Sequence, residues 1–144
     1  MRKIGLFILA FMFMGLVVKA QAHKIGDKFG GGVVFSTIDG GAHGLIAETQ
    51  DQGKSKWKDA PALIAVKENH SAAGKAFKDW RLPTKDELNK LFKKKDIVGG
   101  FVNSAYWSST ELDNNFAFDQ FFEDGNQTNT NKSFTMAVRS IRSF

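Results

Sequence analysis

The chain has 144 residues, no cysteine, and a formal net charge of +5 from 20 basic and 15 acidic side chains. The lack of cysteine excludes a disulfide framework, a thiol nucleophile and any metal site built on thiolates. The length suits a single domain with one core, and the chain is rich in aromatic side chains, with 14 phenylalanines and three tryptophans.

The first 22 residues have the three parts of a cleavable signal peptide. Arg2 and Lys3 give a positive start, residues 4–18 form an apolar run, and Ala20-Gln21-Ala22 supplies a small-x-small cleavage site. An apolar run of about 15 residues is shorter than the roughly 20 that span a bilayer as a helix, so an uncleaved membrane anchor is the weaker alternative. We therefore expect a mature domain of residues 23–144, secreted or held in the periplasm or at the cell surface, without a membrane span.

Part of the positive charge belongs to this N-terminal segment. Because Arg2, Lys3 and Lys19 lie in it, residues 23–144 keep 17 basic side chains against 15 acidic ones, a net charge of about +2. Such a balance does not indicate a nucleic-acid partner.

The first half of the mature chain predicts a hairpin followed by a helix. Residues 33–35 and 44–47 are typical of paired strands joined by a turn at 39–41. The glycines at 30–32 indicate a bulge or a close approach of two backbones. A polar loop over 51–58 then leads to a helix over 59–69, with Asp59 as N-cap and Pro61 in its first turn, and residues 70–78 are expected to be irregular.

A second helix has the clearest start signal of the chain. Thr84 and Glu87 form a capping box, in which each side chain satisfies a backbone N–H of the other residue. Leu88, Leu91 and Phe92 follow on one face, three lysines at 93–95 occupy the predicted last turn, and two glycines at 99–100 end the segment.

The C-terminal part predicts a β-meander. Residues 106–110 and 116–122 read as strands, and Phe116, Phe118 and Phe122 share one face of the second. A tight turn at Asp124-Gly125 and an Asn/Thr-rich bridge over 126–132 lead to a last strand over 134–141. Together these elements predict one α+β domain.

Six segments together resemble a known bacterial family. They are Ile25-Gly26-Asp27 with Gly31-Gly32-Val33-Val34-Phe35, Gly44-Leu45-Ile46-Ala47, Asp79-Trp80-Arg81-Leu82-Pro83-Thr84-Lys85-Asp86-Glu87-Leu88, Tyr106-Trp107-Ser108-Ser109-Thr110-Glu111 and Ala137-Val138-Arg139-Ser140-Ile141-Arg142-Ser143-Phe144. In this order they resemble the domain-of-unknown-function family that includes the C-terminal domain of the Legionella collagen-like adhesin. The resemblance covers essentially the whole mature chain.

The resemblance implies a C-type-lectin-like fold, distantly similar to formylglycine-generating enzymes. Such a fold has a mixed, mostly antiparallel sheet flanked by two helices, with adjacent N- and C-terminal strands and a ligand site on loops of the C-terminal half. The adhesin relative is associated with sulfated glycans, host surfaces and trimer formation. This chain has no collagen-like repeat, so self-association is left open.

No catalytic constellation emerges from the mature chain. The formylglycine-generating relatives depend on cysteine, which is absent here. His23, His43 and His70 have no nucleophile set beside them and lack the close spacing of zinc ligands. The acidic pairs at 111/113 and 123/124 lie in predicted turns, where carboxylates are usually solvated rather than facing each other across a cleft. We therefore expect a protein that is not an enzyme.

Binding chemistry is better represented. Exposed aromatic rings and amide or carboxylate groups bind sugar hydroxyls, while lysines attract sulfate groups. The candidate ligand-binding residues are Trp57, Tyr106, Glu111, Asp113, Asn115, Asn126, Asn129, Lys90, Lys93 and Lys94. Trp80 and Trp107 are expected in the core, and Arg81, Arg139 and Arg142 are expected to pair with Asp79, Asp86 or Glu87.

Calcium is the one cofactor that the composition leaves open. Hard cations favour carboxylate and amide oxygens, and Asp113, Asp119 and Asp124 lie in a segment rich in both. EF-hand spacing and the calcium motifs of C-type lectins are missing, and Asp and Asn are also ordinary turn residues. The leading expectation is therefore an exported, non-catalytic module that binds a glycan or surface polymer. The alternatives are a structural or protein-interaction domain of the cell envelope and an enzyme with a pocket of titratable groups.

Overall fold

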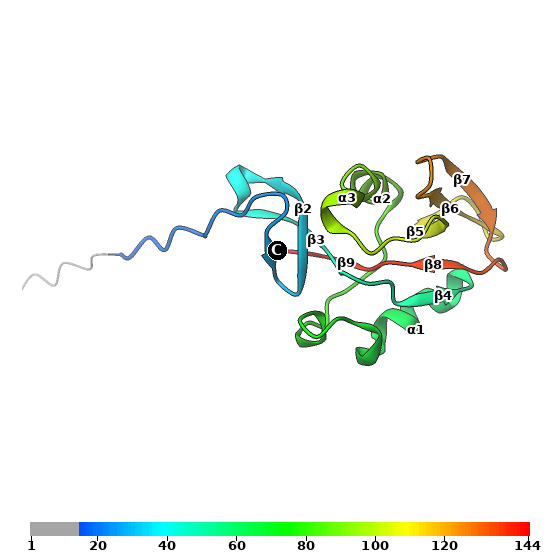
Figure 1. Cartoon of the computed structure of the whole chain (residues 1–144), viewed down its shortest axis with the longest axis horizontal. Helices are drawn as coiled ribbons and strands as arrows, with labels where there is room; N and C mark the ends of the chain where they lie inside the picture. Colours follow the sequence, from blue (N-terminus) through cyan, green and yellow to red (C-terminus); the bar gives the residue numbers. More distant parts are fainter. Residues whose placement is uncertain (1–14) are drawn as a thin grey trace, which may run out of the picture.

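The computed structural model describes residues 15–144 (Figure 1). Most of the predicted signal peptide, residues 1–14, lies outside the described residues. Residues 15–22 are exposed and carry neither helix nor strand. Within residues 15–144, no helix has the length and hydrophobicity that crossing a bilayer requires. The rest of the chain combines two sheets with short helices, which confirms the predicted α+β class.

A four-stranded antiparallel sheet contains both ends of the domain. Its strands are β1 (Lys28–Phe29), β2 (Gly32–Ile38), β3 (His43–Ala47) and β9 (Ile141–Ser143), in the order β1-β2-β3-β9. The predicted β2–β3 hairpin is confirmed. The last strand joins this N-terminal sheet as expected, but it pairs with β3 and not with the first strand. Gly32 makes the predicted close approach, because a Cβ there would lie 2.0 Å from the carbonyl oxygen of Ala47.

A five-stranded sheet forms the other half of the fold. It consists of β4 (Gly53–Ser55), β8 (Met136–Val138), β5 (Ala105–Glu111), β6 (Phe116–Phe121) and β7 (Gln127–Asn131), in the order β4-β8-β5-β6-β7. Only β5 and β8 run parallel. The predicted meander is present as β5-β6-β7, and β8 then returns to the opposite side of β5.

Three strand predictions are corrected by this sheet. The loop over 51–58 contains β4, and the Asn/Thr-rich bridge is the edge strand β7. An edge strand has one hydrogen-bonded neighbour and can be polar, so the hydrophobic pattern does not reveal it. The single strand predicted over 134–141 is divided into β8 and β9 because the chain passes from one sheet to the other at Arg139 and Ser140.

The helices lie on opposite sides of β8 and β9 (Figure 1). α1 (Ala60–Ala65) lies on one side, and α2 (Lys85–Phe92) and α3 (Lys95–Val98) lie on the other. The capping box of α2 is confirmed, with both reciprocal bonds present. Two helix ends were predicted too late. α1 stops because Val66 is extended, and α2 ends at Phe92, so Lys94 and Lys95 lie beyond its last turn.

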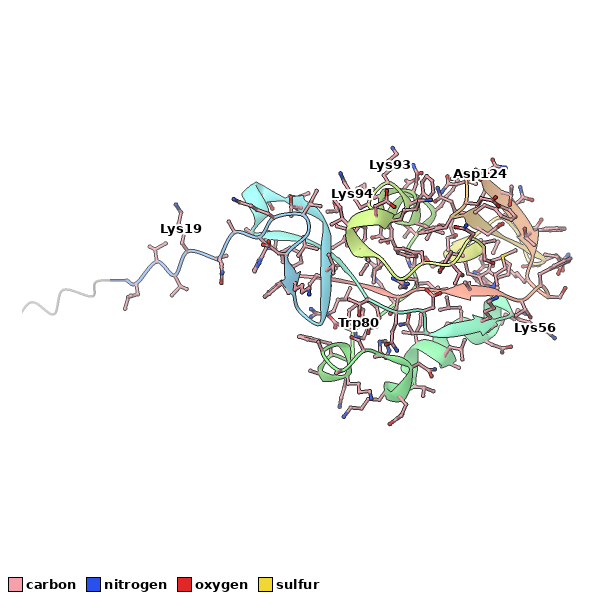
Figure 2. The ribbon with its side chains drawn as sticks, viewed as in Figure 1. Lys19, Lys56, Trp80, Lys93, Lys94 and Asp124 are labelled. Carbon is pink, nitrogen blue, oxygen red and sulfur yellow. The ribbon has the colours of Figure 1, made fainter. Side chains whose placement is uncertain are left out.

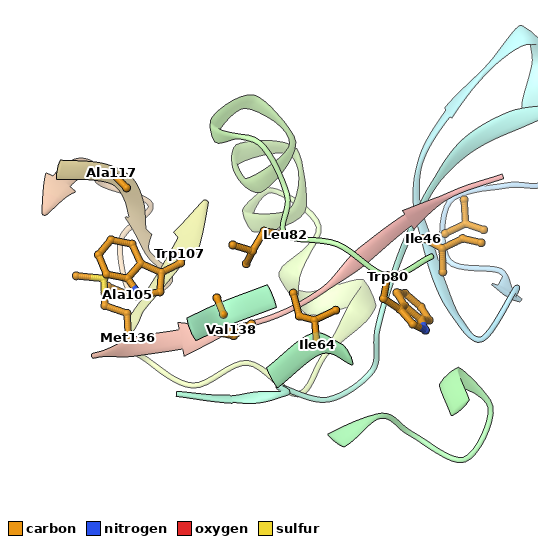
Figure 3. Close-up of a cluster of buried hydrophobic side chains, with 11 residues drawn as sticks. Ile46, Ile64, Trp80, Leu82, Ala105, Trp107, Ala117, Met136 and Val138 are labelled. Atoms are coloured by element: carbon orange, nitrogen blue, oxygen red, sulfur yellow. The ribbon is translucent and has the colours of Figure 1, made fainter. Parts of the chain in front are cut away.

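Two apolar clusters fill the space between these layers. The first follows β8 from Trp107 and Met136 to Trp80 and Ile46 beside the four-stranded sheet (Figure 3). This confirms that Trp80 and Trp107 belong to the core. The second contains Leu88 and Leu91 of α2 together with Tyr106 and Phe122.

Three arginines form ion pairs with acidic side chains. Arg81 pairs with Glu87 and Arg142 pairs with Asp79, as predicted. Arg139 does not pair with any of the predicted acids: it is fully buried, and its Nε donates to Asp51 Oδ1 at 2.8 Å. Its two terminal nitrogens donate to the carbonyl oxygens of Glu48, Gly99 and Gly100. Arg139 therefore joins three chain segments at the point where β8 leaves its sheet.

Asp119 is a buried carboxylate whose titration should affect stability. Burial raises its pKa, and hydrogen bonds from Thr130 and Thr128 oppose this increase only in part. An acid with a raised folded-state pKa destabilises the fold once the pH exceeds that pKa, and this penalty persists at neutral pH. We therefore expect Asp119→Asn to increase the free energy of unfolding at pH 7. The gain should shrink as the pH falls to 3, below the ordinary pKa of an aspartate, because wild-type Asp119, whose pKa is raised, is then protonated. Urea unfolding at both pH values measures this, and an equal effect at both would contradict the explanation.

Candidate functional site

Two adjoining pockets open beside the 3-10 turn formed by Trp57–Asp59, just before α1. One is polar, with a volume of about 320 Å³, and the other is mainly apolar, with a volume of about 700 Å³. Lys58 lines both, whereas Trp57 lines only the apolar pocket and Asp59 only the polar one. A short turn thus presents an aromatic ring, an ammonium group and a carboxylate to one continuous region of the surface.

Trp57 is held in place from two sides. Its indole Nε1 donates to the carbonyl oxygen of Ser108 on β5 at 2.8 Å, and its backbone N–H donates to the carbonyl oxygen of Lys132. The Lys132 ammonium lies 4.5 Å from the centre of the indole ring, a cation–π contact. The ring is half-buried. A ring fixed in this way loses little conformational entropy when a ligand packs against it.

The Lys132 ammonium lies in a pocket of oxygen atoms. It donates to Glu111 Oε2 and to the carbonyl oxygen of Asp113, both at 2.7 Å, and to the carbonyl oxygen of Asn114 at 3.2 Å. The lysine side chain is only 8% exposed. These contacts tie the β5–β6 turn to the end of β7. A fixed ammonium group therefore takes the position that a bound metal ion could otherwise occupy among these oxygens.

The polar pocket contains several side chains around the Lys132 ammonium that have no hydrogen-bond partner within residues 15–144. Its lining residues are Lys56, Lys58, Asp59, Asn114, Asn115, Asn131, Lys132 and Ser133. Asp59 makes no side-chain cap to α1, although it occupies the N-cap position. Within residues 15–144, no hydrogen bond engages the Asn115 amide group, the Asp59 carboxylate, or the ammonium groups of Lys56 and Lys58. Amide, carboxylate and ammonium groups are thus available to a polar ligand.

The apolar pocket runs between α1 and the segment that leads into α2. It is lined by Trp57, Lys58, Pro61, Ile64, Ala65, Lys78, Trp80, Arg81, Leu82, Thr84 and Ser109. Trp80 is fixed by a bond from its Nε1 to the carbonyl oxygen of Gly74 and by stacking on His70. Figure 2 shows Trp80 on the α1 side of the molecule, away from Lys93 and Lys94.

The structure brings together some of the predicted ligand-binding residues. Trp57, Asn115 and, through Lys132, Glu111 and Asp113 surround the two pockets. Asn126 and Asn129 are exposed on the β6–β7 hairpin and line neither pocket.

The predicted lysine cluster lies elsewhere. Lys93 and Lys94 project from the α2 side (Figure 2), and Lys90 lines a separate cavity beside β3 and Phe144. The sequence grouped these lysines because they are close along the chain, whereas the cations at the two pockets come from segments that are distant in sequence.

Tyr106 is a correction. It was predicted to bind a ligand, but its side chain is fully buried in the second apolar cluster. Its hydroxyl donates to Asp51 Oδ2 and accepts from the Val102 N–H, and burial raises the pKa of the phenol, so it stays neutral. Tyr106 lies on β5, whose neighbours β8 and β6 flank it on both edges. It therefore cannot contact a ligand at the surface.

The three predicted calcium candidates are not gathered into one site. Asp113 and Asp124 accept hydrogen bonds from the backbone of their own turns, and Asp119 accepts from Thr128. Among the described residues, no three His, Asp or Glu side chains come close enough to hold a metal ion.

The predicted ligand-binding residues leave out seven that line the polar pocket: Lys56, Lys58, Asp59, Asn114, Asn131, Lys132 and Ser133. Asp59 was assigned only as a helix cap. The lysines at 56 and 58 alternate with Trp57, which is a signal that the sequence did offer. Lys132 could not be assigned, because its partners lie 18 to 21 residues away in an irregular turn.

The buried ammonium of Lys132 gives a prediction for stability. Lys132→Met keeps much of the side-chain volume but leaves Glu111 and two carbonyl oxygens without their donor. Hydrogen bonds from a charged group contribute about 1.5–3 kcal/mol each, but Glu111 is 53% exposed and can be hydrated, so we expect a loss of about 2 kcal/mol in the free energy of unfolding. Lys56→Met removes an exposed lysine of the same pocket and should change it by less than about 0.5 kcal/mol. Urea unfolding of both variants measures the difference; equal effects would show that Lys132 is not a structural cation.

Both pockets lie in a part of the chain that is similar to a known protein family. A family model described as the Lcl C-terminal domain matches residues 36–142, a range that contains every residue lining the two pockets. A search of curated proteins finds no match.

Proposed function

The chain belongs to the Lcl C-terminal domain family, which makes it an adhesion-related domain, and on this basis we propose that it is an exported, non-catalytic module that binds a glycan or another surface polymer. The observation that carries the proposal is the polar pocket. It combines amide, carboxylate and ammonium groups that lack partners within residues 15–144, next to the immobilised ring of Trp57.

This set of groups suits a hydroxyl-rich polymer with negative charges. The Asp59 carboxylate can accept hydrogen bonds from hydroxyl groups, and the Asn115 amide can both accept and donate. The indole of Trp57 offers an apolar surface to a sugar ring. Lys56 and Lys58 add two ammonium groups that attract sulfate or carboxylate substituents. Sulfated glycans are therefore the ligand class that we favour.

The absence of catalysis is part of the proposal. The residues that line the two pockets include no histidine and a single carboxylate, Asp59. His70 lies behind Trp80, and both of its ring nitrogens are already bonded, to Glu48 Oε2 and to the carbonyl oxygen of Ile64. A general base beside a nucleophile is thus not among the groups that the described residues present at the site.

Export with cleavage after Ala22 also belongs to the proposal, and the packing of His23 supports it. Among residues 15–144, His23 is the first that packs against the domain: its N–H donates to the Gly41 carbonyl oxygen at 2.8 Å, and its ring stacks on Phe29 at 3.7 Å. The exposed residues 15–22 precede it directly. We expect the mature protein to begin at His23, which mass spectrometry of the exported product can check. A product that keeps residues 1–22 would contradict the cleavage.

Binding should not require calcium. The oxygens of Glu111, Asp113 and Asn114 already surround the Lys132 ammonium, and Lys56 and Lys58 add positive charge nearby. These charges oppose entry of a second cation.

A glycan array and a heparin column test the proposal on residues 23–144. We expect retention of the protein on sulfated glycans, equal in calcium and in EDTA, and weaker retention as salt increases. Retention that depends on calcium would contradict the role assigned to Lys132. Absence of binding to every glycan in every condition would contradict the proposed function and favour a structural role in the cell envelope. Light scattering would then test whether the domain self-associates.

A further inference from the structure

We propose that the apolar pocket is a second binding site, selective for an anionic group attached to an apolar body, such as an acyl or aryl carboxylate. This goes beyond the proposed function, because the chemistry of this pocket differs from that of the polar pocket next to it. Three features of the pocket favour such a ligand: its apolar walls, its lack of carboxylate and amide groups among residues 15–144, and the positive charges that line it.

The walls are apolar and fixed. Trp57, Ile64, Trp80 and Leu82 form most of the lining together with Pro61 and Ala65. Ile64, Trp80 and Leu82 also belong to the first apolar cluster (Figure 3), so the pocket opens directly onto the core of the domain. Its volume of about 700 Å³ falls within the range of about 300–1,000 Å³ that is typical of small-molecule sites.

In the part of the chain that the structure describes, the pocket lacks the carboxylate and amide groups that bind sugar hydroxyls. Among the described residues, none with a carboxylate or a side-chain amide lines it. Its two hydroxyl groups are those of Thr84 and Ser109, and Thr84 Oγ1 already accepts from the Glu87 N–H in the capping box. A ligand rich in hydroxyls would leave most of them unpaired here, which is unfavourable. The apolar part of a ligand has no polar groups, so its burial in this pocket leaves no hydrogen bond unpaired.

The charges that line the pocket are all positive. They are the ammonium groups of Lys58 and Lys78 and the guanidinium of Arg81. Arg81 is held by Glu87 through two bonds of 2.7 and 2.8 Å. Within residues 15–144, no hydrogen bond or ion pair engages Lys58 or Lys78, and both are exposed. Two uncompensated ammonium groups beside an apolar wall are complementary to a ligand with an anionic end.

Titration of residues 23–144 with small probes tests this assignment. Isothermal calorimetry and tryptophan fluorescence would follow dodecanoate, below its critical micelle concentration, and 2-naphthoate, which distinguish an acyl from an aryl body. Dodecyltrimethylammonium has an apolar body with the opposite charge, and glucuronate has a carboxylate without an apolar body. We expect at least one of the first two probes to bind and neither of the last two.

Matched variants locate the binding. Ala65 lies on the pocket wall and is exposed, so Ala65→Trp should fill the pocket without disturbing the core and weaken binding by about tenfold or more. Ala62→Trp places the same side chain on an exposed position of α1 that does not line the pocket, and it should leave binding unchanged. Lys78→Glu should weaken binding, whereas Lys93→Glu on the opposite side should not (Figure 2). Circular dichroism confirms the fold of each variant.

Three results would overturn the assignment: no binding of either anionic probe, equal binding of the quaternary ammonium, or equal affinities in Ala65→Trp and the wild-type protein. Binding of glucuronate alone would show that the pocket accepts sugar acids instead. Heparin retention, measured on the same samples, reports on the polar pocket separately. Failure of one proposal is therefore distinguishable from failure of the other.

Discussion

Replacing Arg139 by methionine should destabilise the domain by about 3–5 kcal/mol, the usual consequence of removing one partner of a buried ion pair. Arg139 is fully buried, and Asp51 is only 19% exposed. Without the guanidinium, Asp51 Oδ1 and the carbonyl oxygens of Glu48, Gly99 and Gly100 lose the Arg139 donors together, while Asp51 Oδ2 keeps only the Tyr106 hydroxyl. Since small domains are stable by about 5–15 kcal/mol, such a loss would leave the fold marginal at 37 °C.

Urea unfolding monitored by tryptophan fluorescence measures this effect. Arg81→Met is the matched control, because its pair with Glu87 lies near the surface and its side chain is 42% exposed. Surface pairs contribute at most about 1 kcal/mol, so the control should shift the unfolding midpoint far less. If both variants lost similar stability, the buried bonds of Arg139 would not be more important than a surface ion pair.

Replacing Trp57 by alanine should weaken binding of a sulfated glycan about thirtyfold, because truncating a central aromatic residue of a binding site commonly costs about 2 kcal/mol or more. The indole lines the apolar pocket and lies beside Lys58, which lines both pockets. The substitution also removes the cation–π partner of Lys132. The ligand would lose an aromatic surface to pack against, and the Lys132 ammonium would lose its cation–π contact.

Trp57→Phe separates these contributions. Phenylalanine keeps an aromatic face but cannot make the bond from Nε1 to the Ser108 carbonyl oxygen. We therefore expect an affinity between those of the wild-type protein and Trp57→Ala. Affinities would be measured by calorimetry well below the unfolding temperature of each variant. Unchanged affinity in Trp57→Ala would exclude the indole from the binding surface.

The parts of the fold that were predicted correctly depend on short-range signals. The β2–β3 hairpin and the capping box of α2 are encoded within a few residues, where turn and cap chemistry leave few alternatives. The resemblance carried by the Trp-Arg-Leu-Pro-Thr and Tyr-Trp-Ser-Ser-Thr segments indicated the family that the model match then showed. Local chemistry and shared motifs were sufficient for both.

The features that were missed depend on contacts between distant segments. Arg139 and Asp51 are 88 residues apart in the sequence, and nothing near either residue marks the pair. Tyr106 follows a loop along the chain, yet β5 lies at the centre of its sheet. The first four residues of β5 are all buried, so its sequence shows no alternation between a buried and an exposed face. The polar strand β7 gave no hydrophobic pattern because it lies at an edge.

The candidate site was predicted in part for the same reason. Trp57 and Asn115 were selected by residue type, and the structure places both beside the pockets. Lys58 and Asp59 were not selected, because in the sequence they belong to a polar loop and a helix cap. Their importance depends on Asn115 and Lys132, which reach the same pocket from the β5–β6 turn and from the end of β7.

The central claim is that the surface around Lys58 binds an anionic polymer, and a paired charge reversal tests it most directly. Lys58 lines both pockets, whereas Lys93 projects from the opposite side of the molecule (Figure 2). Lys58→Glu and Lys93→Glu change the net charge equally and both alter exposed side chains. The salt concentration at which each variant elutes from heparin should fall sharply for Lys58→Glu and stay close to that of the wild-type protein for Lys93→Glu. Equal elution of the two variants would mean that only net charge controls retention, and the claim would be wrong.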